Sequence, residues 1–383
     1  MEKIGLYIHI PFCHSKCAYC DFSSYAIGNA QNENAIKRYI HALSNEMDLY
    51  EEILRNVEIE TLFIGGGTPT CIDGKYIHEL INHLKKISNI SETAEVTIES
   101  NPGTITNEKL DHYLSAGINR ISMGLQTTDN TLLSSIGRIH DFNTFVTSFR
   151  AIREAGIKNI NVDIMFGLPG QTLENLHHTL DTLIELSPEH ISAYALKLEE
   201  GTPMYEAEKK GLIHMPDEDL ERTMYHIIIE VLKKSGYNQY EISNFSKKGF
   251  ESRHNLVYWK NKPYLGLGLA AHSKMDQVRF SNETIMSRYL EKIENGEKPA
   301  IDQVVISERE DLFETIILGL RLNEGLNIQM INERYGIDFY SENEDTINKL
   351  RHQGLVQMTD DNLKLTLKGI DLSNQVFLTF MND

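Results

Sequence analysis

Short apolar runs alternate with longer amphipathic stretches over roughly the first 240 residues, and this alternation restricts the fold more than any other feature of the chain. A short apolar run is typical of a buried strand, and apolar residues at helical spacing are typical of a helix that covers a sheet. The predicted strands are Ile4–Ile10, Glu60–Ile64, Glu95–Glu99, Arg120–Gly124, Asn159–Met165 and His190–Leu196, and the predicted helices between them are Asn34–Leu54, Gly74–Ile87, Asn107–Ala116, Phe142–Ala155 and Leu173–Leu186.

Repeated strand–helix units predict a parallel sheet with right-handed crossovers, closed partly or fully into a (β/α) barrel. In such folds ligands bind where the strands end, so residues that follow strands are the candidates for chemistry. Chemically capable groups do follow the predicted strands, namely Cys13, the run Gly65-Gly66-Gly67-Thr68-Pro69, Glu99, Gln126 and Asp163. We therefore expect one functional site, at the rim of the barrel where the strands end.

The strand–helix rhythm weakens after about residue 240. Short strands are predicted at Asn238–Ile242, Leu265–Leu269 and Gln277–Ser281, in a segment that we expect to cap the barrel. From about Ser307, three amphipathic helices and a hairpin suggest a winged-helix-like module, whose few cations favour packing or partner docking over DNA binding. The predicted fold class is thus α/β, a partial (β/α) barrel with a C-terminal, mostly helical domain, divided at residues 1–240, 241–306 and 307–383.

The charge balance limits the kinds of partner that this chain is expected to bind. The formal net charge is −18 and no Lys/Arg-rich run occurs, so a polyanion-binding surface and a nucleic-acid partner are not expected. No apolar run approaches the ~20 residues that span a bilayer, and the start lacks the apolar segment of a secretory signal. We expect a cytoplasmic protein without stable membrane insertion, able to contact a membrane protein briefly.

Three of the four cysteines are clustered near the N-terminus, as Cys13-x3-Cys17-x2-Cys20. In a reducing compartment such clustering favours a metal or cluster site over disulfides. Three thiolates on one short loop suit three irons of a [4Fe-4S] cubane and leave the fourth iron without a local ligand. Cys71 lies alone and is interpreted as a buried thiol, although it is also a candidate for a missing ligand.

Zinc is the alternative occupant of this loop. A Cys3His site would need one imidazole besides the three thiolates, and His9 and His14 both lie close enough in sequence. The cysteine triplet alone leaves this alternative open.

The residues around the cysteines carry a family resemblance. Tyr7-x-His9-Ile10-Pro11-Phe12-Cys13-x3-Cys17-x-Tyr19-Cys20 resembles the entry segment of radical S-adenosylmethionine (SAM) proteins related to oxygen-independent coproporphyrinogen III oxidase. The likeness covers about the first 300 residues and continues through Gly65–Thr70, Ile121–Gln126, Asp163–Pro169 and Ser192–Ala195. It implies that Cys13, Cys17 and Cys20 hold a [4Fe-4S] cluster whose open iron chelates SAM, and that one electron from the cluster cleaves SAM to a 5′-deoxyadenosyl radical.

The same resemblance implies a set of SAM contacts. Glycines after a strand let the backbone approach a ligand closely, and acids beside an arginine suit a zwitterionic sulfonium ligand with ribose hydroxyls. Each of these side chains could otherwise cap a strand or form a surface ion pair. The implied contacts are Tyr7, Tyr19, Gly66, Gly67, Thr68, Glu99, Gln126, Arg138, Asp163 and Ala195.

Two departures from the oxidase pattern shift the expected function. The oxidases carry a further cysteine two residues after the third, where this chain has Phe22, which places porphyrinogen decarboxylation in doubt. The run His254-Asn255-Leu256-Val257-Tyr258-Trp259 resembles the H-N-x-x-Y-W signature of HemW-type heme chaperones. His254 would then be an axial heme ligand, with Tyr258 and Trp259 flanking the porphyrin. Alternatively, His254 stabilises a turn and the two aromatic side chains belong to the core.

Taken together, these features predict a heme chaperone that binds a [4Fe-4S] cluster, SAM and heme. Its expected partners are heme and acceptor hemoproteins, respiratory membrane proteins among them, and a homodimer is a further expectation. The enzyme alternative is oxygen-independent coproporphyrinogen III oxidase, and a third is another radical SAM reaction such as methyl transfer.

Overall fold

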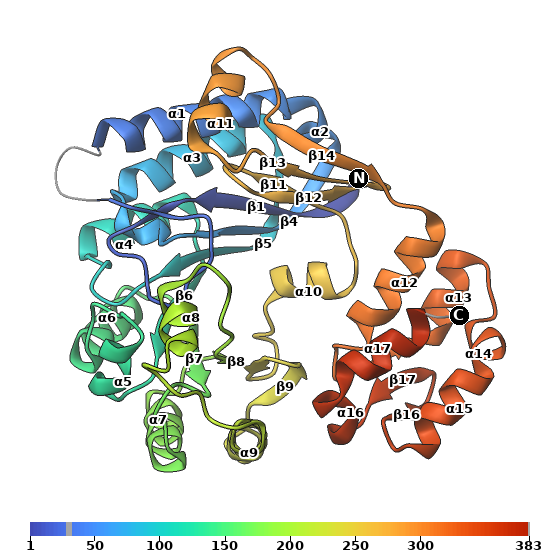
Figure 1. Cartoon of the computed structure of the whole chain (residues 1–383). Helices are drawn as coiled ribbons and strands as arrows, with labels where there is room; N and C mark the ends of the chain where they lie inside the picture. The colour runs from blue at the N-terminus through green and yellow to red at the C-terminus, as the bar shows by residue number, and fades with distance from the viewer. Residues whose placement is uncertain (28–32, 382–383) are drawn as a thin grey trace.

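Twelve strands form one open sheet in the computed structural model, which describes residues 1–27 and 33–381 (Figure 1). Its central six strands pair in parallel and match the six predicted strands. In spatial order they are β1 (Glu2–Ile10), β4 (Val57–Gly66), β5 (Asn89–Ser100), β6 (Arg120–Gln126), β7 (Asn159–Phe166) and β8 (His190–Ala195). They curve into a partial barrel.

Helices connect these strands, and side-chain caps fix where several of them begin. Asp73, Thr106, Asp141 and Thr172 each accept a hydrogen bond from a backbone N–H of the first turn. Gly117 ends one helix with a φ of 92°, which glycine adopts without strain. The helices are α1 (Glu33–Leu49), α2 (Glu51–Asn56), α3 (Gly74–Ile87), α4 (Asn107–Ala116), α5 (Asn130–Ser135), α6 (Phe142–Glu154), α7 (Leu173–Leu186), α8 (Pro203–Lys209) and α9 (Glu218–Lys234).

Two details differ from the predicted helices. The predicted helix Asn34–Leu54 is divided at Tyr50, which leaves the helical conformation and stacks its ring on Phe280, with centroids 6.5 Å apart. The helices α5, α8 and α9 were not predicted. The six residues of α5 hold too little periodicity, although Asp129 caps its start.

Residues from the segment predicted to cap the barrel extend the sheet at both edges. β9 (Asn238–Glu241) and β10 (Asn244–Ser246) continue it beyond β8. β11 (Tyr264–Leu267), β12 (His272–Met275), β13 (Val278–Asn282) and β14 (Ala300–Val305) continue it beyond β1, with α11 (Met286–Glu294) before the last. One helix of this segment, α10 (Arg253–Trp259), lies between the sheet and the C-terminal helices (Figure 1). The division at residues 240 and 306 stays a prediction.

The C-terminal part has a hydrophobic core of its own, which includes Leu320, Ile331, Phe339, Leu350 and Val376. The predicted helices and hairpin are present, shown in orange and red in Figure 1. The elements are α12 (Glu308–Gly319), β15 (Leu326–Asn327), α13 (Ile328–Tyr335), α14 (Phe339–Glu342), α15 (Glu344–His352), β16 (Val356–Thr359), β17 (Asn362–Leu365), α16 (Leu367–Asp371) and α17 (Ser373–Met381).

The two faces of the main sheet differ in chemistry. Ile4, Leu6, Ile8 and Ile10 of β1 belong to the apolar core shared with the surrounding helices. The alternate residues form in-register rows on the inner, concave face, because paired residues of parallel strands point the same way. Two such rows are Tyr7–Phe63–Thr97–Arg120–Asn159 and His9–Gly65 followed by Glu99–Ser122–Asn161–His190. A polar inner face thus leads up to the rim where the strands end. Along the described residues, no helix has the length and apolar character needed to cross a bilayer.

Candidate functional site

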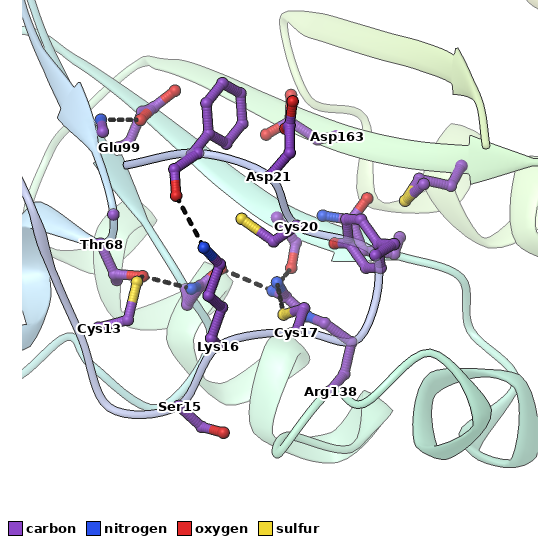
Figure 2. A pocket seen from close by; sticks show the side chains of 18 of the residues that line it. Cys13, Ser15, Lys16, Cys17, Cys20, Asp21, Thr68, Glu99, Arg138 and Asp163 are labelled. Atoms are coloured by element: carbon purple, nitrogen blue, oxygen red, sulfur yellow. Dashed lines mark hydrogen bonds between the residues drawn. The ribbon is translucent and has the colours of Figure 1, made fainter. Parts of the chain in front are cut away.

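The three clustered cysteines line one cavity of about 300 Å³ at the carboxyl ends of the strands (Figure 2). Their loop is closed at its base, where β2 (Phe12–Cys13) pairs with β3 (Tyr25–Ala26). It is anchored at its middle by Ala18, whose N–H donates to Ile136 and whose carbonyl accepts from Met204. Cys13 is buried, whereas Cys17 and Cys20 are half-buried and open to the cavity. Three thiols therefore converge on one space, as the sequence predicts.

The surroundings of the thiols act on their protonation. Burial raises the pKa of Cys13 and of Cys20, which disfavours isolated thiolates. The Thr68 hydroxyl and the charge of Arg138 oppose this rise in pKa at Cys13. Thr68 Oγ1 lies 3.5 Å from Cys13 Sγ, and Arg138 Nη1 lies 3.5 Å from Cys17 Sγ. A cationic cluster core would remove the remaining cost, because metal ions deprotonate coordinating thiols. The donor set thus fits an iron–sulfur cluster.

The glycine run after β4 brings backbone against the cysteine loop. A Cβ at Gly67 would lie 2.6 Å from the Phe12 carbonyl oxygen and 2.9 Å from Cys13 Sγ, which no real side chain tolerates. Gly66 has a φ of 116°, and its N–H donates to Glu99 Oε2 over 3.0 Å. Glycine is required here because the loop passes directly against Cys13 and the Phe12 backbone.

A chain of hydrogen bonds links the glycine loop to the far wall of the cavity. Asn101 Nδ2 donates to Thr68 Oγ1 over 2.7 Å. Arg138 Nη2 donates to Asn101 Oδ1 and to the Gly124 carbonyl, each over 2.6 Å. Arg138 is thereby held across the ends of two strands, and Asn101 positions both neighbours. The sequence analysis missed Asn101, although its place directly after β5 was an available signal.

Two buried carboxyls form the acidic side of the cavity. Burial, together with the charge of Asp163, raises the pKa of Glu99 to about 7. Burial also raises the pKa of Asp163, whose oxygens accept from Asn161 Nδ2 over 2.7 Å and from Ser122 Oγ over 3.2 Å. A cationic or hydroxyl-bearing ligand would stabilise both carboxylates. That property fits the sulfonium, amino and ribose groups of SAM.

Most of the predicted site residues meet at this cavity. Tyr7 lies outside it, with its hydroxyl 2.9 Å from His9 Nδ1, and Ala195 ends β8 one residue before Leu196, which does line the cavity. The predicted residues in the lining are Cys13, Cys17, Cys20, Tyr19, Gly66, Gly67, Thr68, Glu99, Gln126, Arg138 and Asp163. Lining residues that were not predicted include Lys16, Phe22, Asn101, Ser122, Met165, Leu196 and Glu199.

The candidate fourth ligands of a single-metal site, His9, His14 and Cys71, do not line the cavity of the three cysteines. His9 has both ring nitrogens engaged, by Tyr7 and by the Ser23 carbonyl. His14 lines a smaller neighbouring cavity, and Cys71 is buried, with a thiol pKa raised to about 12 by that burial. Across residues 1–27 and 33–381, no group of three or more His, Cys, Asp or Glu side chains, the three loop cysteines included, is arranged around a single metal ion.

The predicted heme residues lie away from the cavity, on α10. His254 is 1% exposed, and its ring nitrogens are 2.8 Å from Thr61 Oγ1 and 2.8 Å from Tyr258 Oη. Its ring stacks on Phe63, and burial lowers its pKa to about 3. Trp259 lies under the Arg321 guanidinium, 4.8 Å from the ring centroid. Since neither imidazole nitrogen is available, these residues do not fit a heme in this conformation.

Comparisons with known proteins agree with this geometry. The Radical SAM superfamily profile matches residues 7–183, and the HemN C-terminal domain profile matches residues 306–372. A solved structure of Escherichia coli coproporphyrinogen III oxidase (HemN), described as a radical SAM enzyme, superposes with a TM-score of 0.85 at 24% identity, covering 99% of this chain and 90% of that one. The predicted fold class is confirmed.

Two relatives extend over nearly the full chain. Heme chaperone HemW of Bacillus subtilis is 37% identical, covering 98% of this chain and 99% of its own length. Heme chaperone HemW of Lactococcus lactis is 34% identical, covering 98% and 97%. With the radical SAM fold, the cysteine loop and the glycine loop in place, the chain belongs to the HemW family within the radical SAM superfamily.

Proposed function

We propose that this protein is a heme chaperone that binds a [4Fe-4S] cluster and SAM and delivers heme to hemoproteins, respiratory membrane proteins among them. The observation that carries the proposal is the combination of a three-thiol cavity with Phe22 at the position of the oxidases' fourth cysteine, in a chain similar over its whole length to proteins named heme chaperone. Phe22 lies at the cavity mouth and is 65% exposed.

Cys13, Cys17 and Cys20 would hold the cluster, because their thiols are the ones that open onto the cavity. The glycine loop would hold the methionine end of SAM, and Glu99 and Asp163 its cationic and hydroxyl groups. When bound and reduced, the cluster supplies one electron for cleavage of the sulfonium carbon–sulfur bond. Arg138, fixed by Asn101, keeps a positive charge beside the cluster loop. The further SAM contacts that we propose are Tyr7, Tyr19, Gly66, Gly67, Thr68, Gln126 and Ala195.

We also propose a cytoplasmic location with transient membrane contact, and a homodimer. The acidic charge balance supports transfer through protein contacts rather than through attachment to anionic lipid. The C-terminal domain, with its own core, is a suitable surface for docking an acceptor.

The cluster assignment is tested by single substitutions of the four cysteines. Cys13→Ala, Cys17→Ala and Cys20→Ala should each abolish the brown iron–sulfur absorbance after anaerobic reconstitution, because each removes one iron ligand. Cys71→Ala is the matched control and should keep full iron and sulfide content. Wild-type cluster content in any of the first three variants would refute the assignment.

The transport role is tested on one reconstituted sample. Titration with hemin at micromolar concentration should shift the Soret band, and SAM should bind with the cluster present. Absence of the Soret shift would contradict heme carriage. Anaerobic turnover of coproporphyrinogen to protoporphyrinogen would instead establish the oxidase, and formation of S-adenosylhomocysteine rather than 5′-deoxyadenosine would indicate methyl transfer.

A further inference from the structure

Asn101 is held in a tight turn directly after β5. Its backbone carbonyl accepts from the Thr104 N–H over 3.1 Å and from the Thr104 hydroxyl over 2.6 Å. The same hydroxyl lies 2.6 Å from Thr70 Oγ1, in the short turn after the glycine run. These contacts fix the backbone that carries the Asn101 side chain, which lines the cavity of the three cysteines.

The contacts of the Asn101 amide determine which of its two ends faces which neighbour. A guanidinium only donates, so Arg138 Nη2 must face the carbonyl oxygen of the amide, 2.6 Å away. The NH₂ group of the amide then faces Thr68 Oγ1 and donates to it over 2.7 Å. Gly124 leaves room for this arrangement, because a Cβ there would lie 3.1 Å from both Asn101 Oδ1 and Arg138 Nη2. The amide has one orientation that satisfies both neighbours.

The direction of the Thr68 hydroxyl follows from this orientation. Its oxygen accepts from Asn101 Nδ2, and a hydroxyl has one proton of its own to donate. The Thr68 N–H donates to the Phe12 carbonyl over 2.7 Å, which keeps the residue against the cysteine loop. Cys13 Sγ lies 3.5 Å from Thr68 Oγ1, and an iron-bound thiolate has no proton. With a cluster in place, the hydroxyl therefore donates to Cys13.

The oxygen end of the Asn101 amide acts on a second cysteine. Arg138 Nη2 donates to Asn101 Oδ1 and to the Gly124 carbonyl, each over 2.6 Å, and these two bonds fix the guanidinium. Arg138 Nη1 then lies 3.5 Å from Cys17 Sγ (Figure 2). Two of the three loop cysteines thus face a hydrogen-bond donor, and one amide orients both donors.

We propose that Asn101 is a positioning residue, which directs hydrogen bonds from Thr68 and Arg138 onto the sulfurs of Cys13 and Cys17 and thereby raises the reduction potential of the cluster. This inference rests on the proposed function, because it needs the [4Fe-4S] cluster on these cysteines. Hydrogen bonds to the cysteine sulfurs favour the reduced cluster, which carries one more negative charge. Asparagine suits the position because its amide donates at one end and accepts at the other, whereas an aspartate only accepts.

Asn101→Asp tests the direction of the Thr68 hydroxyl. The carboxylate still accepts from Arg138, but it has no proton for Thr68, so the hydroxyl turns to the carboxylate and Cys13 loses its donor. The anaerobically reconstituted full chain is reduced by dithionite at set potentials, and the one-electron-reduced cluster is counted by EPR. At a fixed potential the ratio of reduced to oxidised cluster should fall at least fivefold, which is about 40 mV for one electron.

A double-mutant cycle separates the lost hydrogen bond from the added negative charge. Thr68→Val removes the hydroxyl and should lower the ratio about fivefold, whereas Thr68→Ser keeps a hydroxyl and should retain the wild-type ratio. In the Thr68→Val background, Asn101→Asp should have a smaller effect than in the wild type, because the hydrogen bond to Cys13 is already absent. Asn143→Asp on the exposed surface of α6 is the control for added charge and should change nothing.

Several results would overturn the positioning role while leaving the cluster itself in place. They are a wild-type potential in Asn101→Asp, equal potentials in Thr68→Val and Thr68→Ser, and equal effects of Asn101→Asp in both backgrounds. Iron and sulfide content should stay at the wild-type level in all these variants, because the three cysteines are unchanged. Loss of iron from Asn101→Asp would show a structural role instead and would also overturn the inference. A wild-type protein that forms no cluster would contradict the proposed function, and the inference with it.

Discussion

At the scale of single residues, Glu46 shows how one buried carboxyl ties distant parts of the chain together. It lies on α1, is 0% exposed, and accepts hydrogen bonds from the Gly268 N–H over 2.8 Å, Asn282 Nδ2 over 2.6 Å and Tyr289 Oη over 2.6 Å. Burial raises its pKa from 4.5 to about 7, although the three donors oppose the shift. The folded state therefore prefers this carboxyl protonated.

This shift predicts the direction of a pH effect on stability. A carboxyl whose pKa is higher in the folded state binds more protons there, so its contribution falls as the pH rises from about 4.5 to about 7 and stays low above that. Glu46→Gln, which resembles the protonated form, should remove this part of the decline, by up to about 3 kcal/mol. Urea unfolding at pH 5 and pH 8 measures this decline in the free energy of unfolding. Glu52→Gln on the exposed surface of α2 is the control, and parallel pH curves for wild type and Glu46→Gln would contradict the prediction.

At the scale of elements, the end of β6 combines strain with function. The register of β6 against β7 shifts between Gly124 and Gln126, and Gln126 adopts a φ of 75°, in the left-handed region that costs a non-glycine residue about 1 kcal/mol or more. The irregularity turns the Gln126 side chain into the cavity lining. Backbone strain is stored here at the candidate SAM site.

Substituting glycine for Gln126 tests the backbone strain and the SAM contact separately. Gln126→Gly relieves the left-handed backbone and should change the free energy of unfolding by less than about 1 kcal/mol, because relief and added chain entropy offset each other. SAM affinity should fall about tenfold, since one polar contact worth roughly 1.4 kcal/mol is lost. Gln126→Ala keeps the strain of the native backbone and should lose the same SAM affinity. Without strain, glycine in a strand is about 0.5–1 kcal/mol less stable than alanine, so a glycine variant that is less stable than the alanine variant by this amount in urea unfolding would show that the backbone is not strained.

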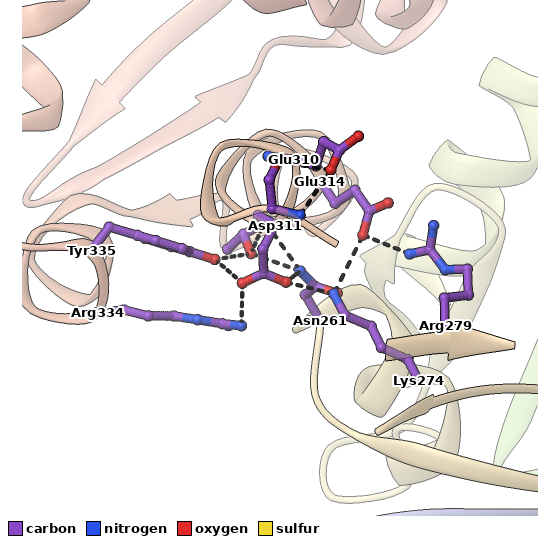
Figure 3. A network of polar contacts seen from close by, with 10 residues as sticks. Asn261, Lys274, Arg279, Glu310, Asp311, Glu314, Arg334 and Tyr335 are labelled. Carbon is purple, nitrogen blue, oxygen red and sulfur yellow. Dashed lines mark hydrogen bonds and ion pairs between the residues drawn. The ribbon is translucent and has the colours of Figure 1, made fainter. Parts of the chain in front are cut away.

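At the scale of the whole molecule, two separate hydrophobic cores are joined by a polar network (Figure 3). Lys274 of β12 is 4% exposed, and its Nζ lies 2.6 Å from Asp311 Oδ1 and 3.3 Å from Glu314 Oε2. Arg279 pairs with Glu314 over 2.6 Å, and Arg334 with Asp311 over 2.8 Å. Charges on β12 and β13 thus hold α12 of the C-terminal domain against the sheet.

Removing the buried cation should weaken this junction. Lys274→Met leaves Asp311 and Glu314 short of a partner in a partly buried site and should cost about 3 kcal/mol. Limited proteolysis between β14 and α12, together with urea unfolding, should report a loosened C-terminal domain. Lys3→Met is the matched control, because its ion pair with Glu60 is exposed to solvent and should contribute little to stability. Equal effects of the two substitutions would show that the network does not hold the domains together.

Local pattern by itself determined the six central strands, most of their helices and the rim where Cys13, Glu99, Gln126 and Asp163 meet. It could do so because apolar periodicity sets which face of each element is buried, and parallel pairing brings the strand ends to one edge. Only the tertiary structure decided that Asn101 bridges Thr68 and Arg138, that residues 264–305 extend the sheet, and that His254 lies inside the barrel between Thr61 and Tyr258. These placements depend on contacts between residues far apart in the chain, whose geometry local periodicity does not encode.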